Sequence, residues 1–385
     1  MLPQIVAKYR DIFQENPIIV KAPARINLIG EHTDYNQGFV MPGSIQRALY
    51  FAFGKTEKDK KLKIWSTHFK ELLILEAQVT SIAPSWGIYL QALLDVLAEE
   101  GVLLTGVHCV FGGDIPLGAG LSSSAALCCG FLFGISHLFE LDFSRSKIAL
   151  LAQRAEQRVG LNCGLMDQYA ILYGKAGKVL QLDCQNLTFK YCDLNLENHT
   201  LVLINSKIEH NLAVDSAYNA RRAACERVVT ALVKSGHEEI HSLRDVSFNI
   251  LANIQNEIDP VDVRRARYVL AENRRVGQMA AAIQKKDWKT CGRLLSESHR
   301  GLSQEYQVSV PKIDLLVALA EKQPGCLGAR MMGGGFGGCT LNLLHKESQA
   351  NAITAIQTAY WEKTKIEVEV YEVELSNGME LVEED

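Results

Sequence analysis

The chain has 385 residues, of which 48% are hydrophobic and 22% are charged, a composition typical of a globular protein. This length favours two domains over a single core. The formal net charge is −4, the chain has no long basic run, and no apolar stretch approaches about 18 residues, so the sequence indicates neither a nucleic-acid-binding nor a membrane-spanning protein.

The amino-terminal segment does not have the pattern of a signal peptide. Lys8, Arg10 and Asp11 stand where such a peptide requires an uninterrupted apolar core. The ten cysteines include no C-x-x-C pair, so we expect buried free thiols instead of disulfides or a metal site. We therefore expect a cytoplasmic protein.

The first half of the chain reads as short strands followed by helices. Strands are expected where β-branched or aromatic residues lie between turn residues, and helices where apolar residues recur at helical spacing. The predicted strands are 17–22, 39–40, 49–53, 62–65, 72–78 and 106–111. The predicted helices are 87–100, 123–139 and 144–158, and a hairpin is expected at 178–182 and 187–192.

The second half is predicted to be mostly helical. A strand at 200–205 precedes helices at 217–235, 261–285, 288–306 and 312–321, and a glycine-rich turn at 333–338 leads to a strand at 339–344, a helix at 349–363 and a strand at 366–375. We expect an α+β protein with domains at 1–190 and 191–385, in which helices pack against mostly antiparallel sheets. In the helix 261–285, arginines alternate with Asp262 and Glu272, and we expect a solvated face there.

The segment from Gly113 to Ala126 follows a predicted strand and opens a buried helix. Gly118 and Gly120 permit backbone conformations that a Cβ would block. Ser122–Ser124 stand where a helix leaves unpaired N–H groups at its positive end, which suits a phosphate. The lysine of the G-x-x-x-x-G-K-[ST] loop is missing. The alternative is a Ser-capped helix after a glycine turn.

Residues 333–338 contain five glycines in six positions, which is more than a plain turn needs. Ordering each of these glycines costs roughly 0.5–1 kcal/mol relative to alanine. We therefore expect another backbone or a ligand to lie against this loop. A flexible linker is the alternative, although Phe336 and the following strand argue against it.

Two further segments are rich in polar groups. Between Arg25 and Asn36, the residues Glu31, His32 and Asp34 could hold several hydroxyls through charge-assisted hydrogen bonds, or they could form a solvated turn. Asp167 follows a glycine turn and stands at the start of a short apolar helix, 168–172. It is either a helix cap or a general base in a cleft.

In this order and at these separations, the four segments resemble the GHMP family of small-molecule kinases. Gly30-Glu-His-Thr-Asp-Tyr35 is similar to the signature of the galactokinases, and the resemblance extends almost from end to end. It implies a two-domain GHMP kinase fold, with an amino-terminal domain like the second domain of ribosomal protein S5 and a ferredoxin-like carboxy-terminal domain. It also implies phosphorylation of the anomeric hydroxyl of galactose with ATP and Mg²⁺.

The resemblance assigns a role to each matching residue. Asp167 would take the proton of the anomeric hydroxyl or orient it, and since a neighbouring arginine favours a charged carboxylate, both roles stay open. Arg25 would stabilise charge on the transferring phosphoryl group. The expected sugar ligands are Glu31, His32, Asp34, Gly164 and Tyr218. The expected phosphate-binding residues are Gly118, Ala119, Gly120, Leu121, Ser122, Ser123 and Ser124. Ser124 and Glu156 would bind Mg²⁺, and the loop 333–338 would back the site.

Some alternatives remain at this level. The acceptor could be N-acetylgalactosamine, arabinose or a uronic acid, and a non-catalytic galactose and ATP sensor would share much of the pattern. The intact serine loop, Asp167 and Arg25 argue against a sensor. Trp86 is either close to the adenine or part of the core. Galactose and MgATP are the expected partners, with neither nucleic acid nor membrane, and we expect a monomer.

Overall fold

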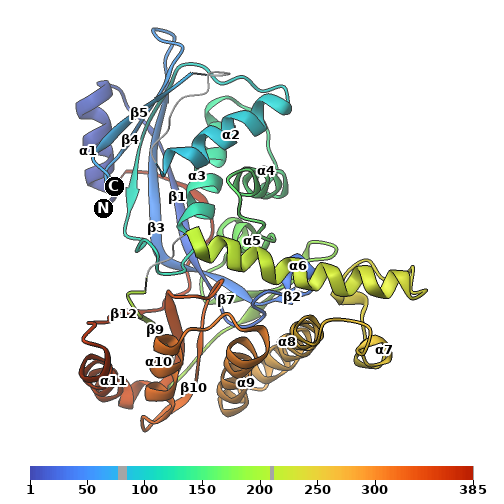
Figure 1. The fold of residues 1–385 in the computed structure, drawn as a ribbon. Coiled ribbons are helices and arrows are strands. Elements are labelled where there is room, and N and C mark those ends of the chain that lie inside the picture. Colours follow the sequence, from blue (N-terminus) through green and yellow to red (C-terminus); the bar gives the residue numbers. More distant parts are fainter. Residues whose placement is uncertain (77–84, 209–211, 385) are drawn as a thin grey trace.

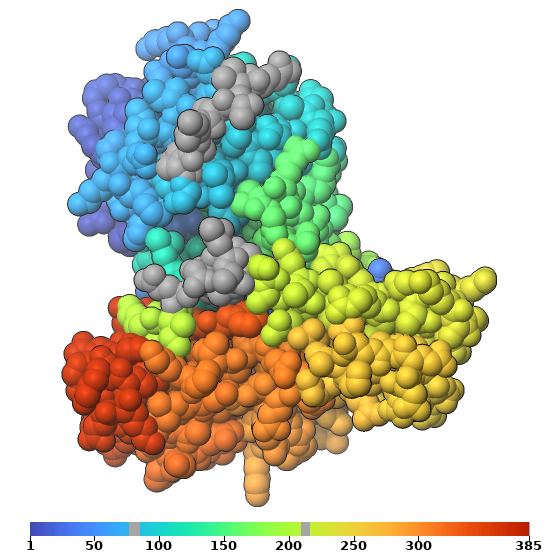
Figure 2. Space-filling model, viewed as in Figure 1, coloured from blue at the N-terminus to red at the C-terminus, as the bar shows by residue number. Residues whose placement is uncertain are grey.

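The computed structural model describes residues 1–76, 85–208 and 212–384. Figure 1 shows an amino-terminal half built around a large sheet and a carboxy-terminal half rich in helices, with α6 (Leu212–Lys234) lying along the junction. In the space-filling view the amino-terminal half lies above the carboxy-terminal half (Figure 2). Within the described residues, no helix is long and apolar enough to cross a membrane.

A six-stranded sheet organises the amino-terminal half in the order β13-β1-β3-β6-β4-β5, with β4 and β6 parallel and the other pairs antiparallel. Its strands are β1 (Ile18–Asn27), β3 (Pro42–Lys55), β4 (Leu62–Ser66), β5 (Glu71–Leu75), β6 (Val107–Gly113) and β13 (Glu380–Val382). Its helices are α1 (Leu2–Phe13), α2 (Gly87–Glu99), α3 (Ser123–Leu138), α4 (Arg145–Arg158) and α5 (Met166–Tyr173). A small sheet of β2 (Phe39–Val40), β7 (Lys178–Asp183) and β8 (Thr188–Asp193) adjoins it.

The carboxy-terminal half has a four-stranded antiparallel sheet in the order β10-β11-β9-β12. Its strands are β9 (His199–Asn205), β10 (Cys326–Met331), β11 (Cys339–His345) and β12 (Glu369–Glu372). Its remaining helices are α7 (Phe248–Ile254), α8 (Pro260–Gln284), α9 (Trp288–Arg300), α10 (Pro311–Glu321) and α11 (Gln349–Thr364). α10 and α11 share one core with the sheet, and a π-helical turn, Gly301–Tyr306, continues α9.

Close packing of α3 on the large sheet fixes where its amino end lies. A Cβ on Gly130 would stand 2.4 Å from the ring of Phe51, and one on Gly134 would stand 2.1 Å from the ring of Phe53. The two glycines are one turn apart, so α3 lies closer to β3 than alanines would allow. The amino end of α3 therefore reaches the level of Arg25 on β1.

Several predicted elements differ in extent from those observed. β1 and β3 are longer than predicted, so Arg25 lies inside a strand, and the strand predicted at 366–375 is limited to Glu369–Glu372. Of the strand predicted at 72–78, Glu71–Leu75 is observed, and residues 77 and 78 lie outside the described part of the chain. The sequence analysis missed α1, α7, β10 and β13.

The solvated face predicted for α8 is present only in part, because Arg267 and Arg274 are exposed but the two carboxylates among the arginines are buried. In α8, Glu272 is fully buried and Asp262 is 3% exposed. Both carboxylates are paired with arginines, Glu272 with Arg275 and Asp262 with Arg227. Charge alternation on a helix indicates a solvated face only where nothing covers it, and α8 lies between α6 and α9.

Candidate active site

A cavity of about 640 Å³ brings together residues from both halves of the chain. Of the predicted site residues, Arg25, Glu31, His32, Asp34, Gly118, Gly120, Leu121, Ser122, Ser123, Ser124, Gly164, Asp167 and Tyr218 line it. Gly333 and Gly334 of the glycine-rich loop also line it, whereas Ala119 and Glu156 do not. Ten of these positions lie in two segments, 25–34 and 118–124, which are about ninety residues apart in sequence.

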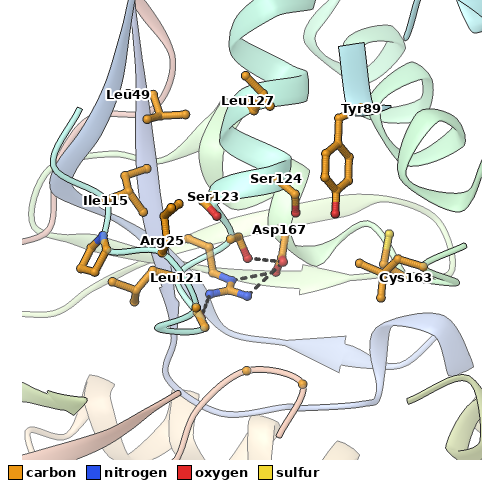
Figure 3. Close-up of a pocket in the computed structure, with 18 of the residues that line it drawn as sticks. Arg25, Leu49, Tyr89, Ile115, Leu121, Ser123, Ser124, Leu127, Cys163 and Asp167 are labelled. Atoms are coloured by element: carbon orange, nitrogen blue, oxygen red, sulfur yellow. Dashed lines mark hydrogen bonds and ion pairs between the residues drawn. The ribbon is translucent and has the colours of Figure 1, made fainter. Parts of the chain in front are cut away.

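Arg25 and Asp167 form a bidentate ion pair in this cavity (Figure 3). Arg25 Nε donates to Asp167 Oδ1 at 2.7 Å and Nη2 donates to Oδ2 at 2.9 Å. Arg25 Nη1 also donates to the carbonyl oxygen of Gly120 at 2.6 Å. The register of β1 against β3 shifts between Pro23 and Arg25. One guanidinium thus joins Asp167 to the glycine turn before α3.

Ser122 stands at the N-cap of α3 but does not cap it. Its φ is 59°, in the left-handed region that a serine rarely occupies, and its hydroxyl donates to Asp167 Oδ2. Asp167 lies in the first turn of α5, and α5 has no side-chain cap either. Both cap interpretations of the sequence are therefore wrong. Because no side chain caps α3, its first-turn N–H groups remain open to an anion at the cavity.

Ser124, in the first turn of α3, lies next to Glu156 of α4. Ser124 Oγ donates to Glu156 Oε1 at 2.7 Å, and Gln168 Nε2 donates to Oε2. Glu156 is 2% exposed, and burial raises its pKa to about 7. A hydroxyl and a carboxylate are hard oxygen donors, so the pair fits a divalent cation that completes its shell with phosphate and water. No group of three or more potential metal-binding side chains occurs among the described residues.

The polar loop after β1 is ordered and largely buried, so a solvated turn is excluded. A Cβ on Gly164 would lie 2.2 Å from Asp34 Oδ2, which shows how closely the two segments approach. Burial, followed by the charge of Asp167, raises the pKa of Asp34 to about 6. His32 is 4% exposed, and burial, followed by the charge of Arg221, lowers its pKa to about 3. The imidazole is therefore neutral at physiological pH.

Glu31 is 1% exposed and accepts three hydrogen bonds within the protein. Asn27 Nδ2 donates to Oε2 at 2.5 Å, and Arg330 Nη2 and the N–H of Gly333 donate to Oε1 at 2.7 and 3.0 Å. Burial raises the pKa of Glu31, and Arg330 acts against that rise. This carboxylate lines the cavity and also ties the polar loop to β10 and the glycine-rich loop.

The glycine-rich loop lies against other backbones, as its composition predicts. A Cβ on Gly338 would stand 3.1 Å from the carbonyl oxygen of Ala119, and one on Gly335 would stand 2.4 Å from that of Val308. Gly333, Gly335, Gly337 and Gly338 all have positive φ. The loop is therefore not a linker, and it supports the turn before α3 from the carboxy-terminal half.

Trp86 is part of the core and also lines the cavity, and its position beside the adenine stays a prediction. It is 6% exposed, and its indole Nε1 donates to Glu71 Oε2 at 3.2 Å. It also lines the cavity together with Phe69, whose ring lies parallel to it at a centroid distance of 6.1 Å. Aromatic faces of this kind suit a planar base.

Sequence reasoning missed the residues that hold the polar loop from behind. Glu272 Oε1 accepts the N–H of Gly30 at 3.0 Å, and Tyr268 donates to the carbonyl oxygen of Glu31 at 3.0 Å. Arg330 is fully buried and donates to the carbonyl oxygens of Asn27 and Leu28. The one available signal was an arginine inside the apolar stretch before the glycine loop, since a buried charge needs a partner.

The comparisons with known proteins cover most of the chain. Three family models match it: the galactokinase galactose-binding signature at residues 7–55, the GHMP kinases N terminal domain at 88–175 and the GHMP kinases C terminal domain at 279–363. The galactokinase of Roseiflexus sp. (strain RS-1) is 40% identical over 364 residues, which are 94% of this chain and 92% of the relative. The chain belongs to the galactokinase family. The galactokinase of Clostridium acetobutylicum is 35% identical over 96% of each chain.

Solved structures agree with this membership. The crystal structure of Lactococcus lactis galactokinase complexed with galactose matches with a TM-score of 0.94 and 30% identity, over 99% of this chain and all of that one. A mevalonate kinase matches with a TM-score of 0.65 at 17% identity, which shows the fold alone. The predicted GHMP kinase fold and the resemblance to galactokinases are confirmed. The protein is a kinase, ATP is its co-substrate, and the alternative acceptors and the sensor are not favoured.

Proposed function

We propose that this galactokinase-family protein transfers the γ-phosphoryl group of ATP to the anomeric hydroxyl of galactose, giving galactose 1-phosphate and ADP. Membership of the family supports the reaction, and the Arg25–Asp167 ion pair supports the place in the cavity where we expect it to occur. This pair lies at the point where the polar loop, the turn before α3 and the start of α5 meet. The experiment at the end of this subsection tests both.

The sugar is expected to bind on the side of the polar loop. Glu31, His32 and Asp34 offer carboxylate and imidazole groups there, and Tyr218 and the backbone of Gly164 complete the lining. Hydrogen bonds to charged groups are worth about 1.5–3 kcal/mol each, so a few of them can orient a sugar against bulk water. Burial of these groups supports the assignment, because their partners must come from the ligand or the protein.

The triphosphate is expected to bind on the side of α3. Residues Gly118 to Ser124 offer backbone N–H groups at a helix amino terminus, where the dipole favours an anion. The base would lie towards Trp86 and Phe69. In this proposed arrangement, the γ-phosphoryl group would lie between α3 and the Arg25–Asp167 pair.

In the transfer step, a bond forms between the anomeric oxygen and the γ-phosphorus while the bond from that phosphorus to the β–γ bridging oxygen breaks. Arg25 stabilises the charge on the transferring group and on the leaving oxygen. Asp167 either takes the proton from the anomeric hydroxyl or holds that hydroxyl in line as a fixed charge. Its two hydrogen-bond donors, Arg25 and Ser122, hold the carboxylate in a fixed orientation, which supports the orienting role.

Mg²⁺ is expected to accompany ATP. The hydroxyl of Ser124 and the carboxylate of Glu156 would hold it, and it would neutralise charge on the phosphates. Burial raises the pKa of Glu156 to about 7, and a cation beside this carboxylate would offset the cost of burying its charge, which supports the assignment. The cytoplasmic location, the monomeric state and the domains at 1–190 and 191–385 stay predictions. β13, in the second of these domains by sequence, pairs with β1 in the amino-terminal sheet.

The deciding experiment is an ADP-release assay with MgATP and a panel of galactose, N-acetylgalactosamine, glucose, arabinose and galacturonate. We expect turnover on galactose and its loss in Asp167→Ala. Turnover on another sugar of the panel would keep the mechanism and change the substrate. Binding of MgATP and galactose without any turnover would contradict the proposal.

A further inference from the structure

Behind His32 runs a chain of hydroxyl groups that ends inside the carboxy-terminal half. His32 Nδ1 lies 2.8 Å from the hydroxyl of Tyr35, which lies 2.7 Å from the hydroxyl of Tyr306. The Tyr306 hydroxyl in turn lies 3.3 Å from Cys225 Sγ on α6. Tyr306 ends the π-helical turn after α9, and π-turns are frequent at functional sites. We call these four residues the His32 relay.

The surroundings of the other ring nitrogen of His32, Nε2, indicate that it binds a ligand. Nε2 is buried and makes no hydrogen bond of ordinary geometry among the described residues, although the backbone of Gly334 lies beside the ring, and the residue lines the cavity. The ring is held against Tyr306 and Tyr218, with centroid distances of 4.8 and 5.4 Å. A buried ring nitrogen without a partner costs free energy, so a bound molecule is the expected partner.

Because the imidazole is neutral, one nitrogen carries a proton and the other does not. Each hydroxyl of the relay has one proton, so if Tyr35 donates to Nδ1, Tyr306 must donate to Tyr35. Either Tyr35 donates to Nδ1 and Nε2 carries the proton, or Nδ1 donates to Tyr35 and Nε2 accepts. The direction of the relay therefore decides what His32 offers to the cavity.

Two considerations favour donation from Tyr35 to Nδ1. An imidazole nitrogen is a stronger acceptor than a phenol oxygen, and a phenol is the stronger donor of the two. The backbone of Gly334 beside the ring favours a protonated nitrogen, and because Nδ1 faces Tyr35, that nitrogen is Nε2. Cys225 does not decide the direction, since its sulfur is both a weak donor and a weak acceptor.

We propose that Tyr35, held by Tyr306, is a positioning residue that keeps His32 in the Nε2–H tautomer, so that His32 donates a hydrogen bond to a hydroxyl of the bound sugar. The proposal rests on the proposed function for the identity of the ligand. The tautomer of the free protein does not depend on it, so the two can fail separately.

The first test is the tautomer itself. Protein labelled with ¹⁵N-histidine gives a two-bond ¹H–¹⁵N spectrum, and the His32 signals are assigned by their loss in His32→Gln. We expect a protonated Nε2 and a bare Nδ1 in the free protein at pH 7.5. A protonated Nδ1 would overturn the proposal whether or not the protein phosphorylates galactose.

The second test is Tyr35→Phe, which removes the partner of Nδ1 and keeps the ring. We expect the galactose KM to rise about 10-fold while kcat and the ATP KM change less than about 2-fold, the size expected from one lost buried hydrogen bond. The His32 signals should also show both tautomers. The control is Tyr191→Phe, which removes a hydroxyl that donates to the carbonyl oxygen of Tyr173 outside the cavity, at 2.7 Å, and should change neither readout.

The combination of results is decisive. An unchanged tautomer and galactose KM in Tyr35→Phe would overturn the proposal, as would an equal rise of both KM values. If Tyr35→Phe does not fold, Tyr306→Phe breaks the relay one step further away. It should then weaken the preference for the Nε2–H form in the same spectrum, and an unchanged spectrum would overturn the role of Tyr306.

Discussion

Asp167 meets its hydrogen-bond donors before any substrate is present. Arg25 contacts both of its oxygens, and Ser122 contacts one of them. Asp167→Asn keeps the shape and one acceptor oxygen but removes the charge. We expect kcat to fall by about 10²–10⁴-fold, with the affinity for MgATP nearly unchanged, because the lost charge acts on the transferring proton and phosphoryl group. ADP release gives kcat, and a large loss of nucleotide affinity instead would make Asp167 a structural residue.

Gly164 leaves space for the carboxylate of Asp34. In Gly164→Ala, the new Cβ would stand 2.2 Å from Asp34 Oδ2, so the carboxylate must move. We expect the galactose KM to rise at least about 10-fold with a small change in the ATP KM, since one misplaced charged hydrogen bond is worth about 1.5–3 kcal/mol. The matched control is Gly277→Ala in α8, where a Cβ meets nothing within 4 Å. Equal effects of the two variants would contradict the assignment of Asp34.

Glu156 makes the stability of the free protein depend on pH. Its pKa rises from 4.5 in the unfolded chain to about 7 in the folded protein. A raised pKa contributes stability that is complete below pH 4.5 and is lost as the pH rises through 7. Glu156→Gln stays neutral, so we expect it to be more stable than the parent at pH 8, by about 3 kcal/mol at most, and similar at pH 4.5.

Thermal unfolding at pH 5, 6.5 and 8 measures this difference. If Glu156 binds Mg²⁺, MgATP should reduce the pH dependence of the parent, and Glu156→Gln should raise the Mg²⁺ requirement of turnover. A variant that is less stable than the parent at pH 8 would contradict the buried, partly protonated state of Glu156.

At this scale, the sequence identified the residue types of the site but not their contacts. Ser122 and Asp167 could each have capped a helix, and local spacing could not exclude it. Their bond to each other joins positions that are 45 residues apart. Only the packing of α3 against β1 and α5 brings them together, and that packing is a property of the fold.

Among the elements, α8 holds the polar loop from the other half of the molecule. Four residues on one face of α8 contact the loop or the strand β2 that follows it. Tyr268 contacts Glu31, Glu272 and Val276 contact Gly30, and Asn273 contacts Phe39 on β2. The spacing of these four residues repeats with the helical turn. The polar loop, which we propose binds the sugar, is therefore positioned by a helix whose own side chains do not line the cavity.

Glu272→Gln tests this dependence, since it keeps the shape of the side chain and removes the charge that Arg275 neutralises. We expect a loss of about 1–3 kcal/mol in stability and a rise of the galactose KM without a matching rise of the ATP KM. The control is Glu297→Gln on α9, which removes one partner of an exposed ion pair with Arg293 and should cost less than about 1 kcal/mol. Stability and KM values that match the control would contradict a role for α8 in positioning the loop.

The long amphipathic and apolar helices were predictable because each repeats its pattern over several turns. α1 and α7 were missed, and β13 has three residues, which is too few for a periodic signal. The buried face of α8 was also misread. Asp262 is neutralised by Arg227 on α6 and Glu272 by Arg275 on α8 itself, and a single sequence does not show which charges have partners.

Across the whole molecule, the polar loop belongs to the amino-terminal sheet by sequence and to the carboxy-terminal half by its contacts. Arg330, on β10, donates to the carbonyl oxygens of Asn27 and Leu28 and to Glu31, and all of these atoms are buried. β13 makes the opposite connection, from the chain end to β1. The two halves therefore hold each other around the cavity.

Arg330→Leu removes the cation of the central tie and leaves the Glu31 carboxylate buried without it. We expect a loss of about 3–5 kcal/mol in stability at pH 8, because an unpaired buried charge is costly. Since burial already raises the pKa of Glu31 and Arg330 opposes that rise, the variant should hold a proton on Glu31 more tightly, and its defect should shrink from pH 8 to pH 5. The double variant Glu31→Gln, Arg330→Leu should be more stable than Arg330→Leu at pH 8. Thermal unfolding of both variants at the two pH values gives this coupling, and strictly additive effects with no pH dependence would mean that the two halves are held together elsewhere.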